Sequence, residues 1–197
     1  MKAKFIIPLI LCITFIFSGF NNNPTKYTLD KGHTYIGFDV ERFMVGEVSG
    51  RFNEFSGNIS IEGEDFTTLQ VQVSINTKSL DTNNETRDGH LKGEMWLNTE
   101  AHPEIKFSST SVIKNVDNSY VMKGNLTICG ITKSIEFPIQ LMGPLKDPTK
   151  VTSIGIKADL VINRFDYGIQ FNRKMDNGSF FIGNEVKIKI RALAIHK

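Results

Sequence analysis

The chain has 197 residues, with 23 Lys and Arg against 21 Asp and Glu. This length favours a single domain that can bury a core of its own. Two of the basic residues, Lys2 and Lys4, lie in an N-terminal segment of twenty residues that contains no acid, so the rest of the chain is close to neutral. A neutral chain without a basic stripe argues against a nucleic-acid-binding protein.

Residues 1–20 have the layout of a secretory signal peptide. Lys2 and Lys4 precede an apolar run over residues 5–17, and small residues follow it. The run is shorter than the roughly 20 residues that a membrane-spanning helix needs, although an uncleaved anchor is the alternative. We therefore expect a periplasmic or secreted domain over residues 21–197. Cleavage removes Cys12 and leaves Cys129, which we expect to be a quiet core or turn thiol.

Alternation of apolar and polar residues dominates the chain after residue 27. It runs through residues 36–40, 48–52, 59–61, 69–75, 105–107, 120–128, 135–141, 154–162 and 186–190. Turn-forming residues separate these runs, as in Asp117-Asn118 and Cys129-Gly130. A period of two with one apolar face is typical of antiparallel strands, so the pattern predicts an all-β sandwich or barrel.

Several glycines lie in or beside the first strands, among them Gly32, Gly37, Gly46, Gly50 and Gly57. Glycine inside a strand often marks a bulge or a sharp bend that curls a sheet toward closure. The same glycines would suit a sandwich, but the bends favour a barrel.

The segment TRDGHLKGEMW, residues 86–96, is the densest group of chemically active side chains. Thr82 and Glu85 fit a capping box, which predicts a short helix that starts at Thr82 and ends at a left-handed Gly93. Inside this helix Arg87 and His90 are near neighbours.

These side chains do not match a known catalytic or metal-binding pattern. A zinc site needs three or four ligands at coordinating spacing, whereas His90 and Asp88 have no second His or Cys nearby. No G-x-S-x-G elbow occurs, and His33, His102 and His196 are scattered singly. We expect Arg87 and Asp88 to be scaffold that satisfies backbone groups, or each other, where the helix closes the barrel. Catalysis and contact with a ligand head group are the alternatives.

Seven blocks follow one another in a recognisable order. They are YTLDKGHTYIGFDV, GEVSGRFNEFSG, INTKSLDTNNETRDGHL, HPEIKFSST, GNLTICGITKSIEFPI, INRFDYGI and GNEVKIKI. From about Tyr27 to Ala194 the chain resembles the YceI-like family of small exported proteins. The resemblance implies an eight-stranded antiparallel lipocalin-like barrel with a short capping helix. It also implies a long apolar tunnel that binds isoprenoid lipids or related amphiphiles, without catalysis or a cofactor.

Two positions depart from the family pattern. Arg42 stands where many relatives have a histidine, and Met95-Trp96 stands where the family usually has Phe-Phe. We expect Met95 and Trp96 to reshape an apolar wall of the tunnel, and Arg42 to add a positive charge at a mouth.

The expected function is an exported binding protein. It would hold a polyisoprenoid, or a similar amphiphile such as an isoprenoid quinone, an isoprenyl phosphate or a fatty acid derivative, for transport, storage or sequestration. The residues that we expect to contact the tail are Phe38, Val40, Phe43, Phe52, Trp96, Phe107, Leu126, Phe137, Ile139, Leu160 and Phe165. A polar head would sit at a mouth with Arg42 or Arg164, although Arg164 also suits a turn network with Asn163 and Asp166.

Two other classes remain open at this point. One is an enzyme that acts on an amphiphile inside the barrel, and the other is a structural domain whose aromatic residues fill a solid core. The expected partner is an amphiphilic lipid, with a homodimer and transient membrane contact as further expectations. Neither a metal nor nucleic acid is expected.

Overall fold

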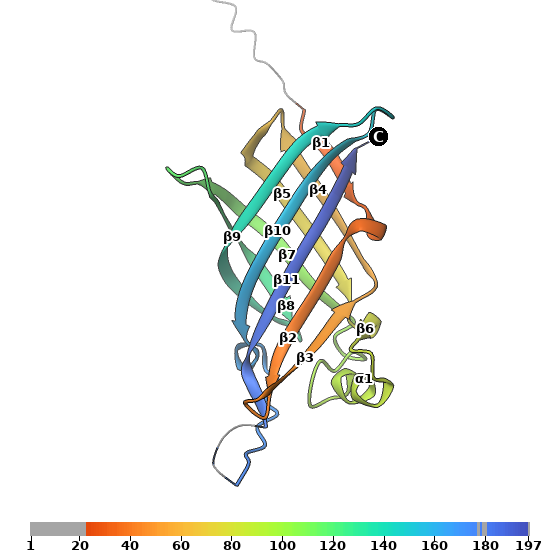
Figure 1. Ribbon diagram of the computed structural model, residues 1–197, viewed down its shortest axis with the longest axis vertical. Coiled ribbons are helices and arrows are strands. Elements are labelled where there is room, and N and C mark those ends of the chain that lie inside the picture. Colours follow the sequence, from red (N-terminus) through yellow and green to blue (C-terminus); the bar gives the residue numbers. More distant parts are fainter. Residues whose placement is uncertain (1–22, 177, 179–180, 197) are drawn as a thin grey trace, which may run out of the picture.

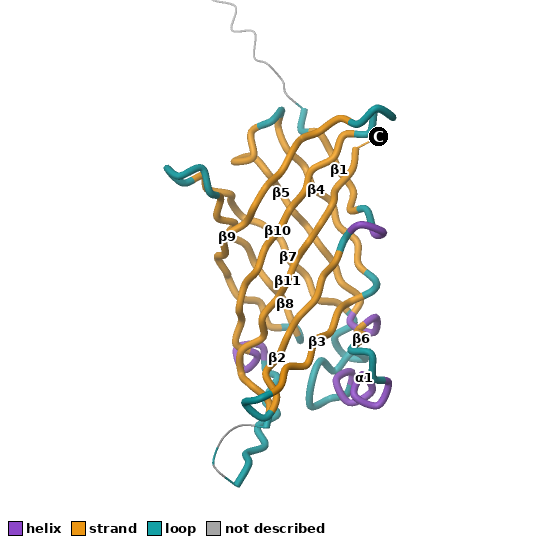
Figure 2. Tube along the Cα trace, viewed as in Figure 1, coloured by secondary structure: helices purple, strands orange, loops and turns teal. Residues whose placement is uncertain are grey.

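The computed structural model describes residues 23–176, 178 and 181–196, and the expected signal peptide lies outside them. Antiparallel strands form the wall of an elongated barrel, and an α-helix lies outside that wall at one end (Figures 1 and 2). Among the described residues, no helix is long and apolar enough to cross a membrane.

The elements follow one another in the order that the alternating pattern suggests. The strands are β1 (Thr25–Leu29), β2 (Tyr35–Arg42), β3 (Gly46–Phe52), β4 (Phe55–Glu62), β5 (Asp65–Asn76), β6 (Leu80–Asp81), β7 (Glu104–Lys114), β8 (Tyr120–Ile128), β9 (Ile131–Lys146), β10 (Thr152–Asn163) and β11 (Ile182–His196). The helices are α1 (Glu85–Lys92) and the 3-10 turns η1 (Lys31–His33), η2 (Thr77–Ser79) and η3 (Arg164–Tyr167).

The sheet closes on itself because β1 and β2 together occupy one position in the ring, beside the last strand, β11. Strands β1 and β2 both pair with β11, and η1 lies between them. On the other side, β4 pairs with β1 and β3 pairs with β2. Beyond them, β5 pairs with β4 and β6 pairs with β3. The result is a closed antiparallel barrel of eight strands, which confirms the expected fold and decides against a sandwich.

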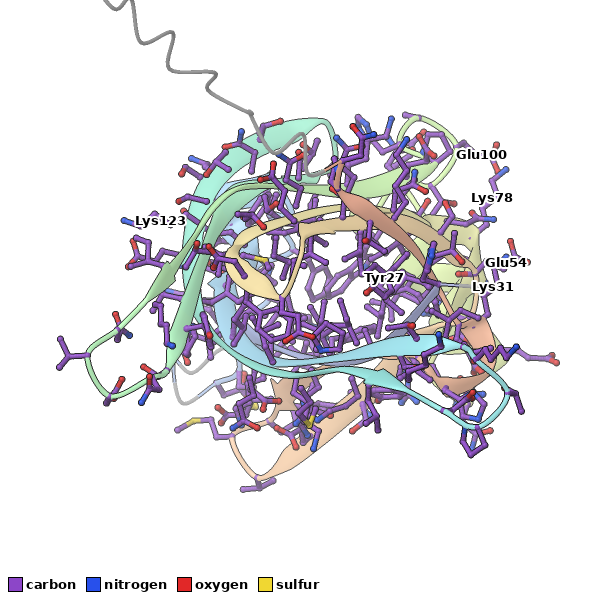
Figure 3. The ribbon with its side chains drawn as sticks, turned by 90° about the horizontal axis from the view of Figure 1, so that it is seen from above. Tyr27, Lys31, Glu54, Lys78, Glu100 and Lys123 are labelled. Carbon is purple, nitrogen blue, oxygen red and sulfur yellow. The ribbon has the colours of Figure 1, made fainter. Side chains whose placement is uncertain are left out.

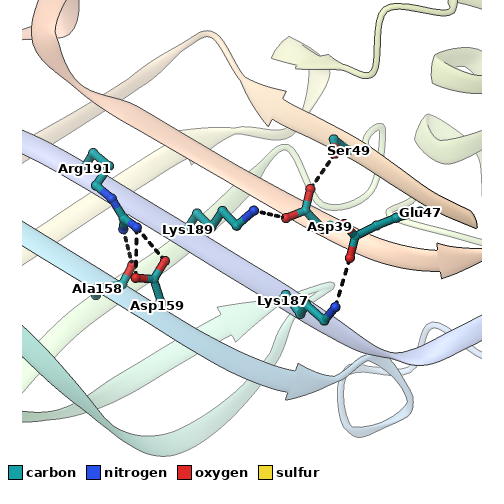
Figure 4. A network of polar contacts seen from close by, with 8 residues as sticks. All are labelled: Asp39, Glu47, Ser49, Ala158, Asp159, Lys187, Lys189 and Arg191. Atoms are coloured by element: carbon teal, nitrogen blue, oxygen red, sulfur yellow. Dashed lines mark hydrogen bonds and ion pairs between the residues drawn. The ribbon is translucent and has the colours of Figure 1, made fainter.

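The outer face of β11 carries a row of basic side chains, each paired with an acid on one of the adjoining strands β10 and β2 or on β3, the next strand beyond β2 (Figure 4). The pairs are Lys187 with Glu47, Lys189 with Asp39, and Arg191 with Asp159. The residues between them, Ile188 and Ile190, face the interior. This arrangement confirms the alternation of one wet and one apolar face along the strand.

Asp39 is the most buried acid of this row, with an exposed fraction of 5%. Its Oδ2 lies 2.5 Å from Lys189 Nζ, and its Oδ1 accepts a hydrogen bond of 2.5 Å from the Ser49 hydroxyl. Burial alone would raise the pKa of Asp39, but Lys189 and Ser49 together lower it further than burial raises it. The carboxylate is therefore held in its charged form on the barrel wall.

One end of the barrel is filled by a packed core. Tyr27, Ile61, Leu69, Ile154 and Ala194 are each at most 3% exposed and belong to one cluster. Figure 3, which looks into the barrel from this end, shows Tyr27 within the ring of strands. This core closes the barrel at the end remote from α1.

The β8–β9 hairpin turns on Cys129 and Gly130, whose φ angles are 48° and 74°. Two consecutive positive φ values are typical of the tight turns that join antiparallel strands. The Cys129 thiol is half-buried, lies 3.5 Å from the Leu97 carbonyl oxygen, and has its pKa raised by burial. Cys129 is thus a turn thiol, as expected from the sequence.

Candidate ligand cavity

A cavity of about 220 Å³ lies inside the barrel, and apolar atoms make up almost all of its wall. A single buried water needs only about 15 Å³ on the same measure, so the interior is not the solid core considered as an alternative. The wall runs from Ile59 in β4 and Val71 in β5 to Leu91 in α1 and to Trp96 and Tyr167. An apolar space of this kind suits a hydrocarbon chain.

Most of the residues predicted to contact a ligand line this cavity. They are Phe38, Val40, Phe52, Trp96, Phe107, Leu126, Phe137, Ile139, Leu160 and Arg164. Phe43, Phe165 and Arg42 are not among the lining residues. Contact between any of these side chains and a ligand stays a prediction.

Arg42 is the last residue of β2, whereas Phe43 and Phe165 follow the ends of β2 and β10, where the alternation of inward and outward faces no longer applies. Phe43 follows β2 and packs edge-on against Phe181, with 4.3 Å between ring centroids. Arg42 is exposed, and its guanidinium lies 4.6 Å from the centroid of the Phe43 ring. Phe165 lies in η3 beneath the Arg164 guanidinium, 4.3 Å from the ring centroid.

Aliphatic residues contribute much of the wall. Many of them were not among the predicted ligand contacts, because that prediction concentrated on aromatic residues. Their lining members include Ile36, Val73, Ile75, Ile105, Ile128, Ile135, Ile156, Ile162, Val186, Ile188 and Ile190. The alternating pattern contained the signal that would have found them, because inward positions on a strand recur at every second residue.

Trp96 is the part of the Met95-Trp96 pair that reaches the cavity. Its indole lines the wall and stacks on the Phe171 ring, with 4.8 Å between centroids and 26° between planes. Met95 is 67% exposed and is not among the lining residues, so the expectation that both residues reshape the wall was wrong for Met95. Both residues lie in a turn, where the alternation of faces that holds along a strand does not apply.

Arg164 is a buried cation at the α1 end of the cavity, with an exposed fraction of 3%. It donates hydrogen bonds to the carbonyl oxygens of Gly183, Ile169 and Ile182, at 2.9, 2.8 and 3.4 Å. Within the described residues no carboxylate forms an ion pair with it, and burial lowers its pKa. The guanidinium therefore serves backbone carbonyls that would otherwise be buried without a donor.

This geometry corrects one expectation about the INRFDYGI block. The turn network exists, since Asn163 Oδ1 accepts a hydrogen bond of 3.0 Å from the Phe165 N–H. Arg164, however, bonds to main-chain carbonyls rather than to Asp166, which is exposed. The charged end of Arg164 joins η3 to the start of β11.

Helix α1 is held against the barrel by the scaffold that the sequence predicted. Asp88 Oδ1 accepts hydrogen bonds from the Thr82 N–H at 2.9 Å and from its hydroxyl at 2.5 Å. Arg87 donates from Nε to the Thr82 hydroxyl oxygen at 2.7 Å and from Nη2 to the Thr82 carbonyl at 2.6 Å. Both side chains thus satisfy backbone groups of a single buried residue, as expected, while His90 is exposed.

The helix starts later than the capping box predicts. Asn84 is the N-cap, because its side chain accepts a hydrogen bond of 2.9 Å from the Arg87 N–H. Gly93 does end the helix, but with a φ of −74° rather than in the left-handed region. Among the described residues, no group of three or more His, Cys, Asp or Glu is placed to hold a metal ion.

Known proteins resemble this chain in sequence, in fold, or in both. The UPF0312 protein SA2479 of Staphylococcus aureus (strain N315) is 34% identical over 171 residues, which are 85% of this chain and 96% of that protein. The crystal structure of the Campylobacter jejuni YCEI protein has a TM-score of 0.68 and 27% identity, with 87% of this chain and 98% of that chain covered.

A polyisoprenoid binding domain from Saccharophagus degradans has the same fold at 15% identity, with a TM-score of 0.65 and coverage of 85% of this chain and 97% of that one. A family model described as a YceI-like domain matches residues 27–194. This match spans all the described strands but the first residues of β1 and the last of β11. The chain therefore belongs to the YceI-like family.

Proposed function

We propose that this protein binds a polyisoprenoid, or another amphiphile with a long hydrocarbon chain, in the barrel cavity. The observation that carries the proposal is the wall of that cavity, which is almost entirely apolar and spans the barrel from Val71 to Trp96. The polyisoprenoid binding domain with the same fold adds support.

An isoprenoid tail has no groups that form hydrogen bonds, and an apolar wall holds it by removing hydrocarbon surface from water. At about 25 cal/mol per Å² of buried apolar surface, each five-carbon unit contributes about 2 kcal/mol. Loss of chain freedom offsets part of this gain. Affinity would therefore rise with tail length until the cavity is filled.

The proposal is for a binding protein rather than an enzyme, because a hydrocarbon wall suits retention of a chain. We infer that the protein carries, stores or sequesters its ligand outside the cytoplasm, since residues 1–20 have the layout of a secretory signal. The expected homodimer stays a prediction.

Native mass spectrometry of the purified protein tests the proposal, followed by solvent extraction and identification of whatever dissociates. A discrete bound mass identified as an isoprenoid or other long-chain amphiphile is the expected result. A ligand-free mass that stays unchanged after incubation with isoprenoids, quinones and fatty acids would contradict it.

A matched pair of variants ties the bound mass to the cavity. Ala192 lines the wall, so Ala192→Phe would occupy space that a tail needs and release the ligand. Ala101 is exposed in the turn after α1, so Ala101→Phe adds the same bulk outside the barrel and should leave the ligand bound. Equal ligand retention by both variants would place the bound molecule elsewhere.

A further inference from the structure

The turn between β2 and β3 exposes apolar side chains at the tip of the barrel. Met44 is 62% exposed and Val45 is 92% exposed. Figure 1 shows this hairpin reaching the end of the barrel at which α1 lies. Contiguous exposed apolar side chains on a loop tip often mark an interaction site.

The backbone of this turn makes the choice of residues more informative. Phe43 and Met44 have φ angles of 55° and 61°, in the left-handed region that bulky side chains rarely adopt. Of the five other described non-glycine residues with positive φ, three are asparagine (Asn83, Asn98 and Asn118), and the other two are Cys129 and Lys150. Met44 combines this unfavourable backbone with an exposed apolar side chain, which favours neither the stability of the turn nor solubility. Such a residue indicates a function at the tip, such as binding a partner.

Cationic side chains flank the apolar tip. The Arg42 guanidinium lies 4.6 Å from the Phe43 ring centroid and 5.7 Å from that of Phe181, and the Arg173 guanidinium lies 5.6 Å from Phe181 on the same cluster. Both arginines are exposed, and residues 42–46 contain no acid; Glu41 and Glu47 lie on either side of this segment, and Glu47 is paired with Lys187. Aliphatic and aromatic side chains beside arginine are typical of segments that bind the interface of an anionic membrane.

The same hairpin forms part of the cavity wall. Phe38 and Val40 in β2 line the cavity, and Val40 pairs in register with Val186, which lines it too. The tip is therefore only a few residues from the space that would hold a lipid tail. A carrier that docks through this tip would present the nearer end of its cavity to the bilayer.

We propose that Phe43, Met44 and Val45, together with Arg42 and Arg173, dock this protein onto a membrane surface that contains anionic lipid. Docking places the α1 end of the cavity at the bilayer, where a tail can pass between membrane and barrel. The transfer step rests on the proposed lipid-binding function, whereas the docking itself does not.

Co-sedimentation with vesicles tests the docking. The full protein should bind vesicles of phosphatidylcholine mixed with phosphatidylglycerol, should bind pure phosphatidylcholine vesicles more weakly, and should dissociate as salt is added. The double substitution Met44→Ser, Val45→Ser should weaken vesicle binding about tenfold, because the apolar side chains no longer enter the interface. Arg42→Gln should weaken it about fivefold on the mixed vesicles alone.

Val116→Ser is the matched control, since Val116, like Met44 and Val45, is an exposed apolar residue on a hairpin turn, here between β7 and β8. It should bind vesicles like the unsubstituted protein. Equal binding by the Met44→Ser, Val45→Ser variant, or equal loss in Val116→Ser, would overturn the proposal.

Native mass spectrometry of the same proteins separates the two proposals. A protein that holds its ligand but never binds vesicles would overturn docking and leave the carrier function standing. A protein that binds vesicles through the tip but holds no ligand would support docking and contradict the carrier function. Urea denaturation of each variant identifies any that lost vesicle binding because it unfolded. If the double variant is unfolded, the single variants Met44→Ser and Val45→Ser are tested in its place.

Discussion

Gly50 and Phe38 are register partners in β3 and β2, and the bare backbone of the glycine makes room for the aromatic ring. A Cβ atom added to Gly50 would lie 2.4 Å from Phe38 Cζ and 2.8 Å from Thr82 Cγ2. Real Cβ atoms do not approach other atoms so closely, so the ring could not keep its place in the cavity wall. Gly124 likewise makes room for the Phe107 ring, at 2.5 Å from an added Cβ to Phe107 Cζ, although its register partner is Ser109.

Gly50→Ala should therefore disturb the cavity wall. We expect it to lower the free energy of unfolding by about 1–3 kcal/mol, the usual cost of overpacking, and to weaken retention of a cavity ligand. Urea denaturation and native mass spectrometry measure the two effects. Gly89 in α1 has nothing within 4 Å of an added Cβ, so Gly89→Ala should instead stabilise the protein, by about 0.5–1 kcal/mol.

Arg164 should matter for stability even without a ligand. Arg164→Met removes the donors to the carbonyl oxygens of Gly183 and Ile169 and should cost about 3 kcal/mol in urea denaturation. Arg51→Met is the control, because Arg51 is exposed and its ion-pair contact with Asp81 is 3.7 Å long. That pair should contribute less than about 1 kcal/mol. A similar cost for both variants would mean that the buried carbonyl contacts contribute little.

The strands could be predicted from the sequence because each carries its own signal. Alternation along β5, β10 and β11 identifies the inward residues without any knowledge of neighbours. The structure places most of them on the cavity wall, and Leu69 and Ile154 in the packed core. Closure of the sheet was a weaker inference, since a glycine such as Gly50 in a strand suits a sandwich as well. The family resemblance supported closure, and the β1–β11 pairing confirms it.

The features that could not be predicted depend on contacts distant in the chain. Arg164 donates a hydrogen bond to the carbonyl oxygen of Gly183, nineteen residues away. Every residue has such a backbone carbonyl, so the sequence does not show which one the arginine will contact. Thr82, Asn83 and Asn84 are all suitable N-cap residues, and the choice among them is made by tertiary packing. Thr82 is 5% exposed, and its hydroxyl is already hydrogen-bonded to Arg87 and Asp88. The side chain of Asn84 therefore caps the helix instead.

Asp39 predicts a dependence of stability on pH. Its pKa is lower in the folded protein than in the unfolded chain, so its charged form stabilises the fold above the unfolded pKa of about 4, and this contribution is lost as pH falls through the folded pKa. At pH 7 we expect Asp39→Asn to cost about 1–2 kcal/mol, since Lys189 is half exposed and screened by solvent.

The difference between Asp39→Asn and the unsubstituted protein should shrink as the pH falls below about 4. Urea denaturation at pH 7 and at successively lower pH measures it. A constant difference across that range would show that the substitution acts through packing and not through the charge of Asp39.

The start of α1 can be tested by three substitutions that separate the observed cap from the capping box. Asn84→Ala should cost about 1 kcal/mol, because Asn84 Oδ1 accepts from the Arg87 N–H. Thr82→Val should cost about 1–2 kcal/mol, because its hydroxyl both donates to Asp88 and accepts from Arg87. Glu85→Ala should change stability by no more than about 0.5 kcal/mol, since the Thr82 N–H that a capping-box Glu would accept from is bonded to Asp88. If Glu85→Ala instead costs as much as Asn84→Ala, then the reciprocal capping box forms in solution and Thr82, not Asn84, begins the helix.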